Sequence, residues 1–146
     1  MTLEKIVQAL DLEPLTSGQA AGGPSGAAAG APAACTTTGA PAGAAAADIS
    51  KAHASDLLSD VLANAPAGGI LLTIQVHMNV LAVAVHAALA AVIFTSGMKP
   101  DEAVRSKAAS EGIPLFTTAQ STCDAAGKLY ALGLRGSTRS AGGRGA

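Results

Sequence analysis

Apolar residues recur along the chain in short segments whose spacing alternates between that of helices and that of strands. The spacing over residues 3–10 predicts an amphipathic helix, followed by a brief strand at 12–16. Beyond residue 48 we expect strands at 49–53, 70–74, 91–95 and 113–116, and helices from 56, over 80–89, over about 100–111 and from about 121 to 133. Strands that alternate with helices favour a mainly parallel central sheet with flanking helices, so the predicted fold class is α/β.

Polar residues at the ends of these segments suggest where helices begin. Ser55 is expected to cap a helix that starts at Asp56, whose carboxylate suits the first turn. Pro100 suits the first position of the helix expected over about 100–111. Thr117 and Gln120 have the spacing of a capping box for the last helix.

The composition changes sharply in the middle and at the end of the chain. Residues 18–47 are rich in Ala, Gly and Pro, which predicts a flexible insert, although a short helix is an option at 44–47. Residues 1–17 supply the first helix and strand of the domain, and 48–134 form its main body. The Gly-, Ser- and Arg-rich tail, 135–146, is expected to be disordered rather than an RNA-binding segment.

Charge and composition exclude several classes of protein. The net charge of −1 and the pI of about 6.2 give no strong field for nucleic acid or an anionic membrane. Residues 61–98 carry no charge, but Pro66, two glycines and later polar residues interrupt them, so buried strands are favoured over a membrane span. Cys35 and Cys123 lie far apart, which predicts no metal site and a reducing cytoplasm, and the N-terminus lacks the pattern of a signal peptide.

Four residues at the start of the second expected helix are candidates for chemistry. The chain contains no glycine-rich phosphate loop, which makes kinase or ATPase chemistry by this chain alone an unfavoured reading. Asp56 and Asp60 are four residues apart on one helix face, with Ser55 and Ser59 beside them. This group suits a metal–phosphate or acid–base chemistry; the alternative is a capped, solvated helix start.

A second polar group follows the strand that ends near Thr73. Gln75, His77 and Asn79 lie on one side if the strand continues that far, which makes them the preferred ligand-facing group. The alternative is a polar loop that satisfies its own backbone. His77 suits a general base, but spacing assigns it no nucleophile.

The remaining polar candidates have simpler interpretations. Thr117, Thr118 and Ser121 stand where a strand gives way to a helix, either to receive an anion or to cap the helix. His86 is expected to be a buried, hydrogen-bonded histidine, and His53 a strand residue without a role.

Three segments, taken in order, resemble the DRTGG domain family. They are Ala54-Ser-Asp-Leu-Leu-Ser-Asp-Val61, Thr73-Ile-Gln-Val-His-Met-Asn79 and Ser121-Thr-Cys-Asp-Ala-Ala-Gly-Lys-Leu-Tyr130. The resemblance covers about 48–134 and the first helix, and is closest to short stand-alone members often labelled as serine kinases. The literal Asp-Arg-Thr-Gly-Gly string is absent.

The resemblance implies a small α/β domain like the N-terminal domain of HPr kinase/phosphorylase, without its nucleotide-hydrolysing core. Relatives sit beside CBS domains and contribute to dimerisation and adenine-nucleotide regulation, and some accompany iron-only hydrogenases. The leading hypothesis is therefore a non-catalytic, homodimeric regulatory or interaction module that binds an adenine-nucleotide-like ligand. The alternatives are an HPr-kinase-like phosphotransfer enzyme and an accessory protein of a redox or phosphotransfer pathway.

The predicted site has no catalytic residue and no metal ligand. Its expected ligand-binding residues are Ser55, Asp56, Ser59, Thr73, Gln75, His77, Asn79, Thr117 and Thr118.

Overall fold

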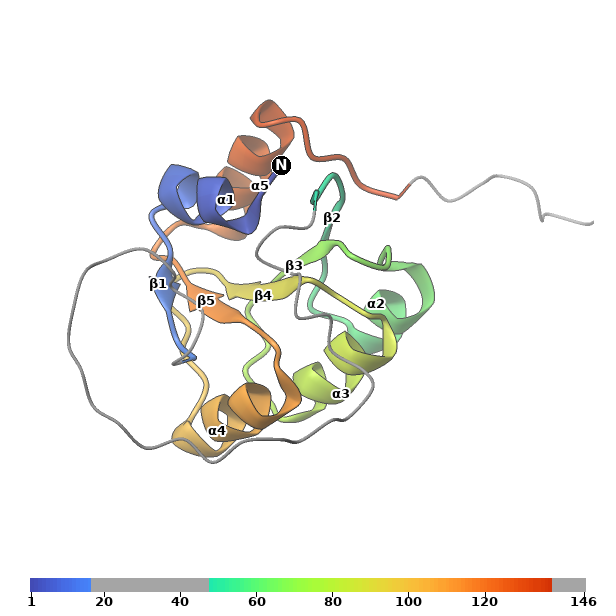
Figure 1. Ribbon diagram of the computed structural model, residues 1–146, viewed down its shortest axis with the longest axis vertical. Helices are drawn as coiled ribbons and strands as arrows, with labels where there is room; N and C mark the ends of the chain where they lie inside the picture. Colours follow the sequence, from blue (N-terminus) through green and yellow to red (C-terminus); the bar gives the residue numbers. More distant parts are fainter. Residues whose placement is uncertain (17–47, 138–146) are drawn as a thin grey trace, which may run out of the picture.

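A five-stranded sheet forms the middle layer of the protein, with helices on both of its faces (Figure 1). The computed structural model describes residues 1–16 and 48–137; the expected insert at 18–47, and the tail beyond 137, lie outside the described residues. The strands are β1 (Glu13–Pro14), β2 (Ala52–Ala54), β3 (Ile70–Thr73), β4 (Ala91–Phe94) and β5 (Leu115–Thr117). The helices are α1 (Leu3–Leu10), α2 (Leu58–Asn64), α3 (Asn79–His86), α4 (Glu102–Glu111) and α5 (Thr122–Ala131).

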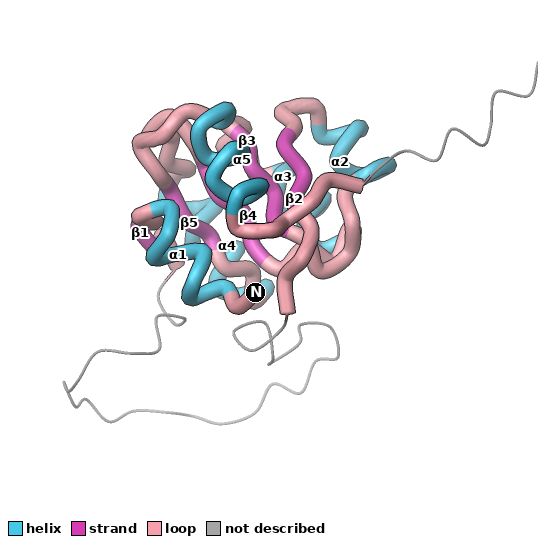
Figure 2. The backbone as a smooth tube through the Cα atoms, turned by 90° about the horizontal axis from the view of Figure 1, so that it is seen from above, coloured by secondary structure: helices cyan, strands magenta, loops and turns pink. Residues whose placement is uncertain are grey.

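The strand order is β1-β5-β4-β3-β2, and only β1 runs antiparallel to its neighbour. Four parallel strands joined by helices confirm the predicted α/β class with a mainly parallel sheet. Helices α2, α3 and α4, which connect the parallel strands, all cover one face, whereas α1 and α5 cover the other (Figures 1 and 2).

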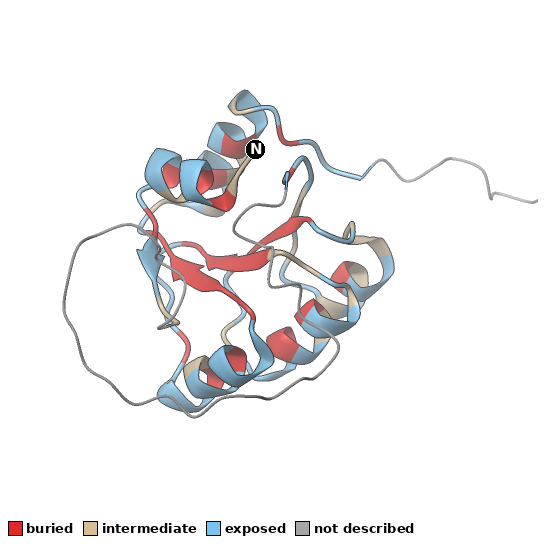
Figure 3. Ribbon diagram, in the orientation of Figure 1, coloured by how far each residue is buried: buried red, intermediate tan, exposed pale blue. Residues whose placement is uncertain are grey.

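Alternation along each strand divides the core between the two faces. Ile70 and Leu72 of β3 pack with α1 and α5, whereas Leu71 between them packs with α2, α3 and α4. The residues of both clusters are buried, and the central strands β3 and β4 are buried along their whole length (Figure 3). Burial on both faces explains why these strands are nearly continuous apolar runs. No helix among residues 1–16 and 48–137 is long and apolar enough to cross a bilayer.

Helix starts are where the sequence-based expectations were wrong. The second helix begins at Leu58 rather than Asp56, and Ser55 does not cap it. Helix α4 begins at Glu102 rather than at Pro100. Asp101 is its N-cap, and the Asp101 side chain accepts a hydrogen bond from Val104 N. The start of α4 thus has a side-chain cap, whereas the residue before α2 is Leu57, whose side chain accepts no hydrogen bond.

The last helix and the C-terminal residues also differ from expectation. Ser121 caps α5 by accepting from Asp124 N, and its hydroxyl donates to the Asp124 carboxylate, so the expected pairing of Thr117 with Gln120 does not form. The chain stays ordered past 134, because Arg135 exchanges backbone hydrogen bonds with residues 50 and 52 beside β2.

Candidate functional site

The carboxyl ends of β3, β4 and β5 meet at one edge of the sheet, here called the carboxyl edge. Each of these strands is followed, or ended, by a buried threonine: Thr73, Thr95 and the pair Thr117 and Thr118. Because the strands are parallel, the predicted groups around His77 and around Thr117 do lie toward the same edge. The strand β4 separates them, so the predicted residues form two groups rather than one.

The first group is organised by Asp56, which joins the ends of β2 and β3. Its Oδ1 accepts from Thr73 Oγ1 at 3.0 Å and from Ile74 N at 2.9 Å, and Thr73 Oγ1 accepts in turn from Gln75 N at 3.1 Å. Ser55 Oγ accepts from Leu57 N at 3.3 Å. Asp56 therefore has a structural task that spacing along the sequence did not suggest.

The other residues of this group lie on the surface. Gln75, His77 and Asn79 are exposed, and Ser59 is exposed on α2. His77 Nδ1 accepts from Asn79 N at 3.2 Å, so its ring orders the start of α3. This contact matches the polar-loop reading of the segment, and it leaves the exposed side chains available to a ligand. His86, expected to be buried, is exposed at the end of α3.

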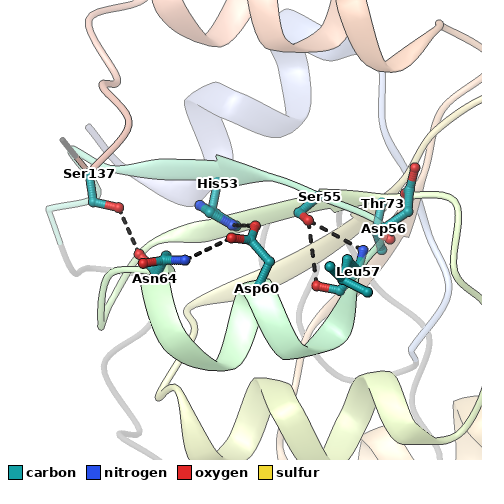
Figure 4. A network of polar contacts seen from close by, with 8 residues as sticks. All are labelled: His53, Ser55, Asp56, Leu57, Asp60, Asn64, Thr73 and Ser137. Carbon is teal, nitrogen blue, oxygen red and sulfur yellow. Dashed lines mark hydrogen bonds and ion pairs between the residues drawn. The ribbon is translucent and has the colours of Figure 1, made fainter. Parts of the chain in front are cut away.

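Asp60 belongs to a separate network between β2 and α2 (Figure 4). His53 Nε2 lies 2.9 Å from Asp60 Oδ2, and Asn64 Nδ2 donates to Asp60 Oδ1 at 2.7 Å. Ser137 Oγ donates to Asn64 O at 2.7 Å, which ties the C-terminal segment to the network. The hydrogen bonds from Asn64 and then from His53 lower the pKa of the Asp60 carboxyl. Asp60 thus links β2 to α2, and Asn64 links α2 to the C-terminal segment.

The second group, Thr117 and Thr118, lies at the end of β5, where the chain begins to connect to a helix on the other face of the sheet. The loop after β4 leads to α4 on one face, whereas the loop after β5 leads to α5 on the other. Neighbouring strands whose loops leave in opposite directions open a crevice, and in open α/β sheets this is where ligands bind. A cavity of about 490 Å³ lies here. Its lining residues are Asp11, Leu12, Glu13, Gly97, Lys99, Thr117, Thr118, Ala119 and Gln120.

Backbone hydrogen bonds between the two loops hold one wall of this switch-point cavity. Ser96 N donates to Gln120 O at 2.7 Å, and Gly97 N donates to Thr118 O at 2.8 Å. Ser96 and Gly97 both have positive φ, 57° and 69°, in a tight turn closed by Met98 N and Thr95 O. Glycine adopts this conformation without the steric cost that a Cβ brings, which accounts for Gly97.

Three charged side chains also line the cavity, namely Asp11 and Glu13 near the start of β1 and Lys99 in the loop after β4. Lys99 Nζ lies 3.0 Å from both carboxylate oxygens of Glu13. Asp11 has a left-handed backbone, φ 52°, at the end of α1. Of the predicted residues, Thr117 and Thr118 line this cavity, but Thr117 Oγ1 already donates to Met98 O and Thr118 Oγ1 to Leu10 O.

One of the residues that line the cavity, Gln120, has a polar side-chain atom without a partner among the described residues. Gln120 Nε2 donates to Leu10 O at 2.8 Å, while its Oε1 is buried and, among the described residues, accepts no hydrogen bond. Most buried acceptors in folded proteins have a hydrogen-bond partner, so this oxygen is an exception.

The residues predicted from the sequence include only Thr117 and Thr118 of this cavity. Asp11, Glu13 and Lys99 are charged residues in short connections, where the sequence pattern gave no reason to single them out. The available signal was the order of connections, because a final helix on the opposite face creates a switch point. No cluster of three or more His, Cys, Asp or Glu residues suited to a metal ion occurs in the part of the chain that the structure describes.

Comparison with solved structures finds a similar fold in the regulatory region of a pyrophosphatase. The match is the crystal structure of the CBS and DRTGG domains of the regulatory region of a Clostridium perfringens pyrophosphatase, in complex with its activator diadenosine tetraphosphate. The TM-score is 0.56 at 13% sequence identity, and the match covers 88% of this chain and 45% of that chain. The likeness supports a DRTGG-like fold, and the present chain spans less than half of the matched one. No family model matches the sequence, and no curated protein matches it.

Proposed function

We propose that this chain is a non-catalytic regulatory or interaction module of the DRTGG type that binds an adenine-nucleotide-like ligand at the carboxyl edge of its sheet. The observation that carries the proposal is the cavity between the loops after β4 and β5, at the switch point of the connections. Its volume of about 490 Å³ is within the ordinary range for small-molecule sites. The structurally similar chain is the regulatory region of a pyrophosphatase, which supports the same interpretation.

The assignments of the carboxylates favour binding over catalysis. Asp56 accepts hydrogen bonds from Thr73 and Ile74, and Asp60 is paired with His53 and Asn64. A catalytic carboxylate needs access to the reacting group, and these two are already committed to holding loops and helices. Phosphoryl transfer also needs a phosphate cradle, for which the sequence has no motif.

A thermal-shift panel tests the ligand proposal. Adenosine, AMP, ADP, ATP and diadenosine tetraphosphate are each added to purified protein, with GTP and CTP as controls for the base. A ligand that binds only the folded state raises the melting temperature with its concentration. We expect at least one adenine compound to do so, without ATP turnover. No shift with any adenine compound at millimolar concentration contradicts the proposal, and robust ATP hydrolysis favours the phosphotransfer alternative.

We propose that a second copy of the chain covers the outer surface of α2 and α3. Most of the large exposed apolar side chains cluster on this stretch: Leu57, Leu62, Ile74, Met78 and Val85. Residues 61–98 contain no Asp, Glu, Lys or Arg, so most of this stretch brings no such charge to a contact between two copies related by a two-fold axis. This α2–α3 face therefore suits a homodimer.

A matched pair of variants tests the dimer. Val85 is 48% exposed on α3, and Tyr130 is 61% exposed on α5 at the other face of the sheet. We expect light scattering to report a dimer for the wild type and for Tyr130→Glu, and a monomer for Val85→Glu. A monomeric wild type at micromolar concentration refutes the dimer. A protein partner from a redox or phosphotransfer pathway stays a prediction, which affinity purification with identification of bound proteins tests.

A further inference from the structure

The helices α2, α3 and α4 form one layer, in which α3 is the middle helix because it packs against both α2 and α4 (Figure 1). The outer surface of this layer carries two apolar features, on opposite sides of α3. One is a projection at the start of α2, and the other is a groove between α3 and α4. Exposed apolar surface of this kind marks an interaction site.

The projection, here called the apolar knob, consists of Leu57 and Ile74. Their side chains are 65% and 43% exposed, and Leu57 is the most exposed of the large apolar residues in the described ranges. Asp56 holds the two loops together, because its Oδ1 accepts from Ile74 N at 2.9 Å and from Thr73 Oγ1 at 3.0 Å (Figure 4). Side chains on loops that are already ordered lose less conformational freedom on binding, so the knob is preorganised for contact.

The α3–α4 groove has a volume of about 220 Å³. This volume is below the range of about 300–1,000 Å³ that is usual for small-molecule sites, so the groove suits apolar side chains better than a ligand. At its rim Lys107 Nζ lies 2.8 Å from Glu111 Oε1, and this pairing leaves the rim without a net charge. The residues that line the groove are Met78, Leu81, Ala82 and Val85 from the α3 segment and Lys107 and Glu111 from α4.

We infer that the apolar knob of each copy occupies the α3–α4 groove of a second copy, about a two-fold axis that runs along the two facing α3 helices. The inference rests on the homodimer of the proposed function, and it specifies which surfaces meet. Because α2 and α4 lie on opposite sides of α3, such an axis places α2 of one copy over α4 of the other. Each contact of knob and groove is then made twice, as in any isologous interface.

The charges beside the knob and the groove favour a second copy as the occupant. Asp56 directly precedes Leu57 of the knob, and it is exposed. At the rim of the groove, the side chain of Lys107 is more exposed than that of Glu111, 54% against 36%. The two-fold axis therefore brings each Asp56 toward Lys107 of the other copy, and complementary charges of this kind fix the register of an interface.

Self-complementarity is the second reason for choosing the same chain. Any other partner must offer both a hollow for the knob and a projection for the groove, and this chain already carries both on one face. The contact between the two α3 helices is free of Asp, Glu, Lys and Arg, because residues 61–98 contain none. An apolar centre with charged residues at its rim is the usual anatomy of a stable interface.

Single substitutions test the two sides of the contact separately. Leu57→Lys carries an ammonium group into the groove, and Val85→Glu places a carboxylate on the groove wall. Both residues are exposed, so the fold should be retained, which circular dichroism checks. We expect each change to raise the dissociation constant of the dimer about tenfold or more, because burial of an unpaired charge is unfavourable. Tyr130→Lys, at a residue 61% exposed on α5, should leave it unchanged.

An equimolar mixture of Leu57→Lys and Val85→Glu tests whether knob and groove meet each other. A heterodimer of the two keeps one natural contact, and in its other contact the introduced ammonium faces the introduced carboxylate. Each homodimer instead contains two contacts with an unpaired charge. We expect a heterodimer at concentrations where either variant alone is monomeric, with a dissociation constant at least tenfold lower. Native mass spectrometry detects it, because the two chains differ in mass.

The outcomes separate this inference from the proposed function. A wild-type dimer that either single variant leaves intact, or two monomeric variants that do not recover on mixing, overturns the pairing of knob and groove and leaves the homodimer standing. A monomeric wild type refutes the pairing together with the homodimer, and the groove is then free for a segment of another protein. The adenine-nucleotide proposal is tested independently by the thermal-shift panel.

Discussion

Replacing each of three glycines by alanine adds one methyl group, and the structure predicts a different effect on stability at each position. Gly97 has φ +69° and open space around the position of a Cβ atom. Gly69 has no unusual φ, but a Cβ there would lie 2.9 Å from both Pro66 Cγ and Pro66 O. Gly127 is in helix α5, with nothing within 4 Å. The series separates backbone strain, steric conflict and helix propensity.

The magnitudes follow from these surroundings. Alanine at position 97 pays about 1–2 kcal/mol for the left-handed conformation and regains about 0.4–1 kcal/mol from a less flexible unfolded chain, a net loss of about 1 kcal/mol. Gly69→Ala should cost about 1–3 kcal/mol, because backbone must shift to admit the methyl group. Gly127→Ala should stabilise the protein by about 0.8–1 kcal/mol, the difference in helix propensity.

Urea unfolding followed by circular dichroism measures the free energy of unfolding of all three variants. In a thermal scan, a loss of about 1 kcal/mol corresponds to a fall of about 4 °C in melting temperature for a domain of about 100 residues. Asparagine is the discriminating substitution, since it tolerates positive φ but is larger than alanine. We expect Gly97→Asn to be more stable than Gly97→Ala, and Gly69→Asn to be no more stable than Gly69→Ala. The reasoning fails if Gly97→Ala is as stable as the wild type, or if Gly127→Ala loses stability.

Further expectations concern individual polar contacts. Hydrogen bonds from Asn64 and His53 lower the pKa of the Asp60 carboxyl in the folded protein. The carboxylate therefore stabilises the fold above the pKa that it has in the unfolded chain, and this stabilisation is lost as the pH falls through the folded pKa. We expect Asp60→Asn to flatten the decline of stability below about pH 4. Identical acid unfolding curves for the variant and the wild type would show that the pair has no such role. Asp56→Ala should cost about 1–3 kcal/mol, since Ile74 N and Thr73 Oγ1 lose their acceptor, and a urea midpoint like that of the wild type would argue against this structural task. Ser121→Ala should cost about 1 kcal/mol through loss of the α5 cap, with Ser121→Asp restoring most of it in the same assay.

Local patterns were sufficient for the elements and for the fold class. The aliphatic runs at 70–73 and 91–94 are strands because short apolar segments between turns can be buried on both faces. The left-handed Gly112 ends α4, as a glycine at the end of a helical stretch indicates. These signals lie within a few residues of the structure they specify, so the sequence alone carries them.

The exact helix starts depended on contacts that spacing does not reveal. Asp56 looked like a first-turn carboxylate, but it instead accepts hydrogen bonds from Thr73 Oγ1 and Ile74 N, which lie 17 and 18 positions away in the chain. Once that carboxylate is committed to the end of β3, the helix begins two residues later. A cap is decided by competition among nearby donors, and folding determines which donors are near.

The switch-point cavity was decided by the tertiary structure alone. Glu13 and Lys99 are 86 positions apart, and they meet because β1 joins the sheet beside β5 while the loop after β4 reaches the same edge. Strand order and the face chosen by α5 result from how the apolar surfaces of all the helices are buried together. Neither leaves a periodic signal in the sequence, and so the sequence determined the parts of this protein while their packing determined its candidate site.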